Sequence, residues 1–133
     1  GTGSFGLECL SRHAKNVYFI EKDKGAFEVS KKNIDKLKLK NKTKIFFSDV
    51  HGWIEKENFS KLKFNLIFCD PPFKSTNFEK LIKLIFSRSL LEKNGIIVFH
   101  RRKDAKENFP NYFRIIDERT YGISRITFGK FLS

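Results

Sequence analysis

The sequence predicts an α/β fold with a mostly parallel sheet, and three features of the chain support this. Short apolar runs typical of strands alternate with segments whose apolar residues recur at helical spacing. The strand-like runs are nearly continuous, as in parallel strands that are covered on both faces. The C-terminal residues 112–131 instead alternate on either side of a Tyr-Gly pair, which predicts an antiparallel hairpin. We expect one layered domain over residues 1–133, because a chain of this length buries one core and not two.

The expected elements follow one another as strand and helix in turn. Strands precede the hairpin at residues 17–21, 44–49, 63–70 and 95–100. Helices are expected between them, and they are 25–37, 50–57 and about 78–90. The first of these helices carries one stripe made of Phe27, Ser30, Ile34 and Leu37. The stripe of the last helix is made of Phe78, Leu81, Ile82, Ile85 and Ser89.

The composition favours an anionic partner. The chain carries 27 Lys and Arg against 15 Asp and Glu, and this net charge of +12 favours nucleic acid as a ligand. A biased composition is the alternative, since Lys, Asn, Ile and Phe are all frequent. No apolar run has the length of a membrane span and no leader pattern opens the sequence, so we expect a soluble cytoplasmic protein.

A metal site is not expected. Cys9 and Cys69 lie far apart in sequence, and neither belongs to a CxxC pair or has a His at the spacing of metal ligands. His13, His51 and His100 are scattered along the chain. Both cysteines are most simply small, buried apolar residues.

The N-terminal glycines predict a turn that approaches a nucleotide. Gly1, Gly3 and Gly6 form a G-x-G-x-x-G pattern before a short expected helix, and glycines at such a turn let the backbone come close to a ligand. Glu21, followed by Lys22, ends the next strand at the spacing at which a carboxylate meets ribose hydroxyls. A solvated charge in a turn is the alternative for Glu21.

Asp49 ends the second expected strand, at the edge where ligands of open parallel sheets collect. Its carboxylate suits the exocyclic amine of an adenine, and the backbone near Ser48 and Val50 is placed to read the same base. The alternative is a helix N-cap, a role that Asp commonly takes.

The segment DPPF, from Asp70 to Phe73, follows the third expected strand without a spacer. Its two prolines stiffen the loop and leave the Pro71 carbonyl as a hydrogen-bond acceptor beside the Asp70 carboxylate, while Pro72 fixes the backbone. Phe73 offers a flat face to a base. Two acceptors beside a stacking ring suit the exocyclic NH2 of a nucleobase. The structural alternative is that X-Pro-Pro only ends the strand.

The chain resembles a known family through this segment and two others. DPPF matches the Asp/Asn/Ser-Pro-Pro-aromatic motif of methyltransferases that use S-adenosylmethionine to modify an exocyclic amine of adenine, cytosine or guanine. Together with GTGSFGLECLSRHAKNVYFIEKD and YGISRITFGKF, it makes the chain similar to the bacterial 16S rRNA guanine-N2 methyltransferases over essentially all 133 residues.

The resemblance implies a Rossmann-like class I methyltransferase fold, a three-layer sandwich whose last strand runs antiparallel between its neighbours. It implies S-adenosylmethionine as the cofactor and ribosomal RNA, or the assembling small subunit, as the substrate. It also implies residues before position 1 that include the first, central strand of the sheet. Without that strand, residues 17–21 and 63–70 must pair directly, leave a gap or recruit backbone from another chain, and we expect weakened cofactor affinity.

The resemblance assigns roles to residues at the carboxyl ends of the strands. The target base is expected at Asp70, Pro71, Pro72 and Phe73. The cofactor is expected at Gly1, Gly3, Gly6, Glu21, Lys22, Ser48, Asp49, Val50 and Asp70. Apart from the resemblance, the basic residues that follow two strand ends are expected to hold phosphates of the RNA, with solvated loop charges as the alternative. They are Lys74, Arg101, Arg102 and Lys103.

The expected reaction is methyl transfer to the N2 amine of a guanine that has left its stack, with the amine held by Asp70 and Pro71. Three alternatives remain. They are an N6-adenine or N4-cytosine methyltransferase acting on DNA or RNA, a nicotinamide dehydrogenase that shares the glycine turn, and an RNA-binding protein with an inactive methyltransferase fold.

Overall fold

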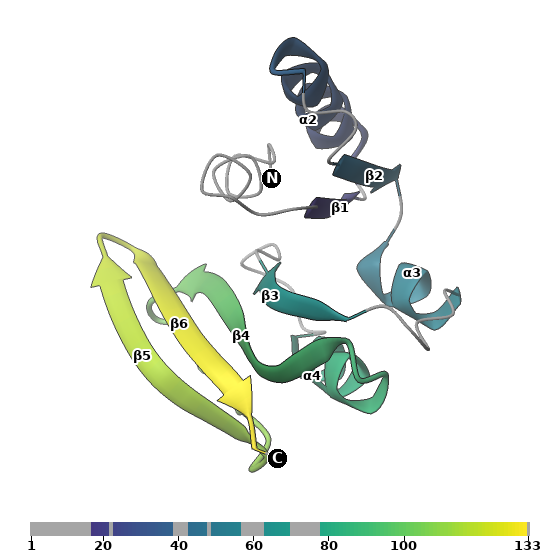
Figure 1. Ribbon diagram of the computed structural model, residues 1–133. Helices are drawn as coiled ribbons and strands as arrows, with labels where there is room; N and C mark the ends of the chain where they lie inside the picture. The colour runs from purple at the N-terminus through teal and green to yellow at the C-terminus, as the bar shows by residue number, and fades with distance from the viewer. Residues whose placement is uncertain are drawn as a thin grey trace. The chain divides into compact units, whose positions relative to one another are not determined.

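A computed structural model describes residues 17–21, 23–38, 43–47, 49–56, 63–69 and 78–132 of the chain, and the structural statements below concern these residues. The chain divides into two compact units, Gly1–Glu57 and Asn58–Ser133, which are described in turn. That residues 1–133 form a single domain stays a prediction. Figure 1 labels the helices and strands.

The first unit contains a strand–helix–strand arrangement. β1 (Val17–Glu21) pairs in parallel with β2 (Thr43–Phe47), and α2 (Lys24–Lys36) connects them (Figure 1). The bounds of β1 agree with the sequence prediction. β2 begins one position before the predicted strand and is described to Phe47. The parallel pairing puts the carboxyl ends of β1 and β2 at the same edge, since Glu21 lies opposite Phe47.

α2 begins and ends at recognisable capping residues. The Asp23 side chain accepts a hydrogen bond from the backbone N–H of Ala26 at 2.8 Å, which satisfies one of the open donors of the first turn. Ser30 and Ile34 are buried, as the predicted stripe requires. Leu37, the fourth member of that stripe, is 54% exposed, because the helix ends at Lys36 and Leu37 belongs to the turn that follows.

α3 (Val50–Lys56) follows β2 and covers part of the first unit. Trp53 and Ile54 are buried, which confirms the short helix predicted from the spacing of apolar residues. The Trp53 ring meets Tyr18 of β1 edge-on, with centroids 6.4 Å apart and planes at 70°. The Lys44 ammonium lies 5.5 Å from the centre of the Tyr18 ring.

The second unit contains a four-stranded sheet in the order β3-β4-β6-β5. β3 (Phe64–Cys69) is parallel to β4 (Leu91–Arg102), while β6 (Ser124–Phe131) is antiparallel to both β4 and β5 (Phe113–Tyr121). The last strand therefore runs antiparallel between its neighbours, as expected. β4 is longer than the predicted strand at both ends, because it continues through the charged residues after Phe99 as the partner of β6.

The described strands form two separate sheets, one of β1 and β2 and one in the order β3-β4-β6-β5. Which of the three arrangements considered from sequence holds for residues 17–21 and 63–70 stays a prediction.

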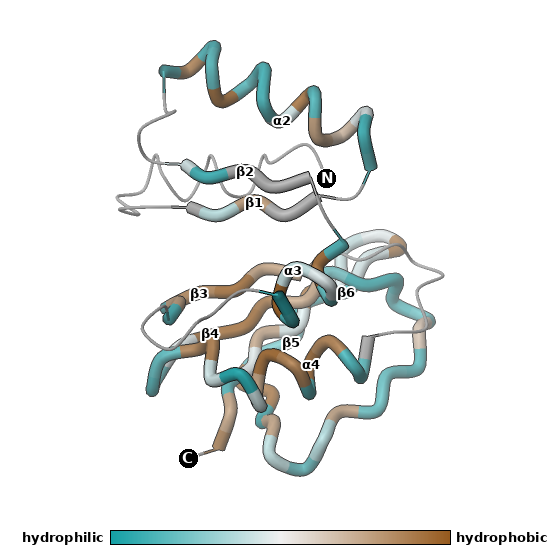
Figure 2. The backbone as a smooth tube through the Cα atoms, turned by 90° about the vertical axis from the view of Figure 1, so that its right-hand side faces the viewer, coloured by the Kyte–Doolittle hydropathy of each residue, from teal (hydrophilic) through white to brown (hydrophobic). Residues whose placement is uncertain are grey.

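α4 (Phe78–Ser87) supplies the helical side of the core of the second unit. Leu81, Ile82 and Ile85 are buried on one face, and Ile97 and Phe99 of β4 are fully buried. Figure 2 shows these apolar stretches of α4 and β4 in brown. The predicted continuation of the stripe to Ser89 is wrong. The helix ends at Ser87, and Ser89 is exposed with a left-handed φ of 52°.

Aromatic rings fill the rest of this core. Phe86 of α4 stacks on Tyr112 with centroids 4.1 Å apart and meets Phe131 edge-on at 5.0 Å. Phe113 lies against Phe131 and, farther in, against Phe99. The Phe113 ring occupies the space where a side chain at position 129 would stand, so β6 requires a glycine there.

None of the helices in the described segments is long and apolar enough to span a membrane.

The turn between β5 and β6 contains Gly122, whose φ of 54° lies in the left-handed region that glycine adopts without strain. The predicted hairpin around Tyr121 and Gly122 is confirmed.

Candidate functional site

The predicted site is only partly within the described residues. Ten of its positions lie outside them, so their placement and roles stay predictions. These positions are Gly1, Gly3, Gly6, Lys22, Ser48, Asp70, Pro71, Pro72, Phe73 and Lys74. For Glu21 the backbone is described, and it forms the last residue of β1.

Asp49 lies at the edge of the first unit where β1 and β2 end. It directly precedes α3, and its Oδ2 accepts a hydrogen bond from the backbone N–H of Gly52 at 3.1 Å. The N-cap alternative is therefore confirmed. Its side chain is 56% exposed, with Oδ1 3.9 Å from Nδ1 of His51. Val50 opens the helix and is half-buried.

The structure brings Glu21 and Asp49 to the same edge of the parallel pair. Glu21 ends β1 opposite Phe47, and Asp49 follows β2 by two positions. Open parallel sheets bind ligands at this carboxyl edge. The Asp49 carboxylate caps α3 through Oδ2 and is more than half exposed, so a ligand at this edge can reach it.

In the second unit, the corresponding edge is built from the ends of β3 and β4 and the start of β6. Cys69, which is buried as expected, is the last described residue before DPPF and lies opposite Phe99. β4 then continues to Arg102, whose partner in β6 is Ser124. His100 belongs to the same edge, with its Nε2 2.8 Å from the Ser124 hydroxyl oxygen.

Arg101 does not present its guanidinium at this edge. It is 4% exposed and its Nε donates to Glu107, whose side chain is 8% exposed. A buried charge held by a buried partner is a structural pair, so the geometry disfavours the predicted contact of Arg101 with phosphate. Sequence reasoning took the basic run after the fourth strand as a loop. β4 in fact continues through it, so successive side chains point to opposite faces of the sheet.

Arg102 and Lys103, in contrast, are exposed at the end of β4. The Arg102 side chain is 51% exposed and lies 3.0 Å from Asp104, which is 66% exposed. Such an exposed ion pair is weak and leaves Arg102 able to exchange its partner for a ligand anion. The two cations fit the phosphate-binding role predicted for them.

The segment after β4 is fixed by backbone contacts. Arg125 of β6 donates from Nη1 to the Lys103 carbonyl at 3.1 Å and from Nη2 to the Ala105 carbonyl at 3.0 Å. The backbone N–H of Lys103 donates to the Ile123 carbonyl at 2.7 Å. Sequence reasoning missed Arg125, whose guanidinium joins the hairpin to this segment through these two hydrogen bonds.

Metal chemistry has no visible donor set in the described segments, where no three of His, Cys, Asp and Glu gather in a group. The absence of a metal in the whole protein stays a prediction.

Comparison with known proteins defines the class first. A Haemophilus influenzae structure described as a methylase superposes with a TM-score of 0.86 at 30% identity, covering 100% of this chain and 83% of that one. A more distant structure, described as a methyltransferase complexed with SAH, has a TM-score of 0.77 at 13% identity, covers 96% of this chain and 42% of its own, and shows the fold alone. The fold is that of the Rossmann-like methyltransferases, as predicted.

The family follows from the sequence comparisons. The family model described as "Conserved hypothetical protein 95" matches residues 1–130, so the chain belongs to this family. A curated relative, the ribosomal RNA small subunit methyltransferase D of Haemophilus influenzae, is 32% identical over 92% of this chain. The chain spans 64% of the length of that relative.

Proposed function

We propose that the protein transfers a methyl group from S-adenosylmethionine to the N2 amine of a guanine in 16S ribosomal RNA, free or in the assembling small subunit. The observation that carries the proposal is the DPPF segment directly after β3, in a chain whose family relative is named as a small-subunit rRNA methyltransferase. The exocyclic-amine motif and the rRNA methyltransferase relative support the same reaction class. Since the proposed substrate is ribosomal RNA, we expect the activity in the cytoplasm.

The residues at the carboxyl ends of β1 and β2 fit the cofactor. Asp49 is an exposed carboxylate at this edge and suits the adenine amine, and Glu21 ends the neighbouring strand, where the ribose would be held. The glycines Gly1 and Gly3 suit a close approach of the backbone to the same ligand. When bound, S-adenosylmethionine supplies a methyl group on a positively charged sulfur.

The chain's own residues position the nucleophile. The N2 amine of guanine is a poor nucleophile because its lone pair is delocalised into the ring. The Asp70 carboxylate and the Pro71 carbonyl accept hydrogen bonds from its two N–H groups, while Phe73 stacks on the ring. These contacts direct the lone pair toward the methyl group. The nitrogen–carbon bond would form as the carbon–sulfur bond of the sulfonium breaks, with its electron pair staying on the sulfur of S-adenosylhomocysteine. The proton released from nitrogen passes to Asp70 or to water.

A single substitution tests this proposal. Asp70→Ala is expected to abolish methylation of 16S rRNA, because it removes one of the two acceptors, while binding of S-adenosylhomocysteine by calorimetry stays nearly unchanged. Asp35→Ala is the matched control and is expected to methylate like the wild type, since Asp35 is an exposed carboxylate on α2 to which no role in the site is assigned. Turnover retained by Asp70→Ala contradicts the assignment.

The reaction product distinguishes guanine from the other amines. Nucleoside mass spectrometry of 16S rRNA incubated with the protein and S-adenosylmethionine is expected to yield N2-methylguanosine. A product methylated at N6 of adenine or N4 of cytosine would keep the reaction class and overturn the base assignment. Thermal stabilisation by NAD and not by S-adenosylhomocysteine would overturn the cofactor.

A further inference from the structure

We propose that the turn of the β5–β6 hairpin and the end of β4 form a second RNA-contacting surface, which binds nucleotides next to the target base. We call it the tip surface, and its residues are Arg102, Lys103, Tyr121 and Ile123. The inference rests on the proposed function, because it takes the same RNA as its ligand. Tyr121 stacks on a base, and Arg102 and Lys103 hold phosphates.

The tip surface lies at the end of the sheet where β3 ends, and DPPF follows β3 directly in the sequence. β3 ends at Cys69, just before Asp70, and β4 runs beside it and continues to Arg102. Arg102 pairs with Ser124, directly after the hairpin turn, so the turn stands at this edge. Figure 1 shows the arrowheads of β3, β4 and β5 at one end of the second unit. Arg102 therefore stands about 10 Å beyond the end of β3 along the strand direction.

Hydrogen bonds join the two parts of the tip surface. Lys103 donates its N–H to Ile123 at 2.7 Å and accepts at its carbonyl from Arg125 at 3.1 Å. The buried pair of Arg101 and Glu107 holds the same segment from the other face of the sheet. Because the backbone is already ordered, RNA binding here costs little conformational entropy.

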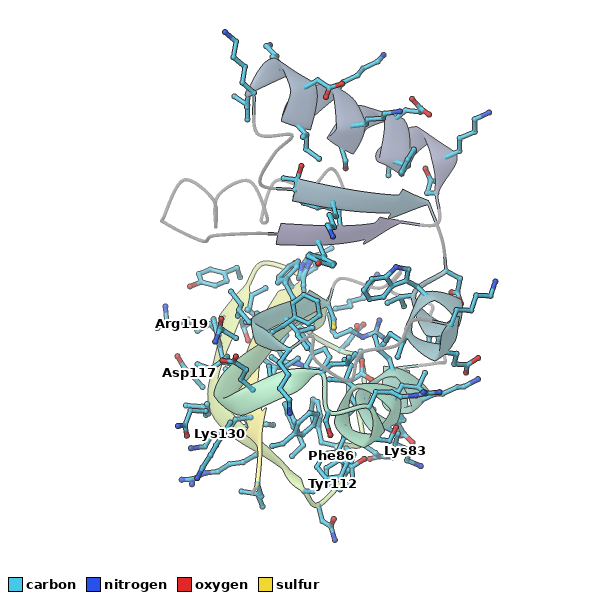
Figure 3. All side chains as sticks on the ribbon, turned by 45° about the vertical axis from the view of Figure 1, so that its right-hand side comes forward. Lys83, Phe86, Tyr112, Asp117, Arg119 and Lys130 are labelled. Atoms are coloured by element: carbon cyan, nitrogen blue, oxygen red, sulfur yellow. The ribbon has the colours of Figure 1, made fainter. Side chains whose placement is uncertain are left out.

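Tyr121 is an exposed aromatic residue that ends β5. Its side chain is 59% exposed at the end of β5. The pKa of the Arg119 guanidinium lies above its usual value, first because of a side-chain hydrogen bond with Tyr121 and then because of Asp117, to which Arg119 Nε donates at 3.1 Å. Figure 3 shows Asp117 and Arg119 side by side on the hairpin. The Tyr121 ring, at the end of the same strand, is open to solvent.

The chemistry of the tip surface fits single-stranded RNA. An exposed ring beside cations provides base stacking and phosphate contacts together, which is how proteins hold unpaired nucleotides. Ile123, 58% exposed, extends the apolar face next to Tyr121. The net charge of +12 on the chain favours a polyanionic ligand such as RNA.

The test measures RNA affinity by fluorescence anisotropy, with a labelled single-stranded oligoribonucleotide of mixed sequence and with 16S rRNA as competitor. Tyr121→Ala is expected to weaken binding about 5- to 150-fold, the range for loss of one base–aromatic stack. Tyr121→Phe retains the ring and is expected to stay within about 3-fold of the wild type. Lys103→Gln is expected to lower the salt dependence by about one phosphate contact.

Lys83→Gln is the matched control for charge, because Lys83 is exposed on α4, well away from Arg119 (Figure 3). It is expected to bind RNA like the wild type. All variants are first compared by thermal unfolding, since every substituted side chain is exposed. Wild-type RNA affinity for a folded Tyr121→Ala protein, or equal losses for Lys103→Gln and Lys83→Gln, overturns the inference.

The same variants separate this inference from the proposed function. If N2-methylguanosine forms and Tyr121→Ala binds RNA normally, the function stands and the tip surface is wrong. If RNA affinity depends on Tyr121 while the product is a different methylated base, the tip surface stands and the guanine assignment is wrong.

Discussion

At the scale of single residues, the ion pair of Arg101 and Glu107 is important for stability because it is buried. Both side chains are nearly inaccessible to water, at 5% and 8% exposure. Removing one partner leaves the other charged and buried, which is far more costly than losing an exposed pair. Because Arg101 is buried in this pair, the basic run of residues 101–103 does not offer all of its cations to RNA.

Arg101→Ala is expected to lower the free energy of unfolding by about 3–5 kcal/mol, because Glu107 would stay buried without its counter-ion. Arg102→Ala, which breaks the neighbouring exposed pair with Asp104, is the matched control and is expected to cost about 0–1 kcal/mol. Urea unfolding of both variants measures the difference. Equal losses would show that the Arg101 pair is solvated in solution.

At the scale of elements, α3 links stability to the proposed cofactor site through one side chain. Asp49 caps the helix through Gly52 and, in the proposed function, also binds the adenine amine. A serine caps a helix about as well as an aspartate but is too short and uncharged to serve the second role.

Asp49→Ser is therefore expected to keep the melting temperature and to lose affinity for S-adenosylhomocysteine. Asp49→Ala is expected to lose both, with a stability cost of about 0.5–2 kcal/mol for the missing cap. Thermal unfolding and calorimetry on the two variants separate the roles. Unchanged affinity in Asp49→Ser would leave Asp49 as a cap alone.

The elements also show what sequence reasoning reached. Strands, helices and the hairpin follow from periodicity, and the antiparallel place of β6 follows from the family resemblance. The misses are at element ends. Leu37 and Ser89 continue an apolar spacing past the point where the backbone turns, which depends on tertiary packing. The extension of β4 was missed because its last residues are charged, and only pairing with β6 keeps them in a strand.

The candidate site was predictable to a different degree. The carboxyl-edge positions of Glu21 and Asp49 follow from strand ends in the sequence. The separation of Arg101 from Arg102 was not foreseen, because it depends on which face of the sheet each one occupies and on Glu107 closing over Arg101. Arg125 and Tyr121 lie far from the basic run in sequence, and only the register of the hairpin brings them to it.

At the scale of the whole molecule, two of the proposed cofactor positions lie in the same unit. Glu21 and Asp49 both belong to the unit Gly1–Glu57. Because a ligand that binds only the folded state raises the free energy of opening, we expect it to stabilise mainly this unit.

Hydrogen exchange measured by mass spectrometry tests this expectation. S-adenosylhomocysteine is expected to slow exchange mainly in the described segments of residues 17–56, because the proposed cofactor positions Glu21 and Asp49 belong to that unit. The increase in the free energy of opening is set by the binding free energy of the ligand. No slowing in residues 17–56, or equal slowing in β4 and β6, would contradict the placement of the cofactor.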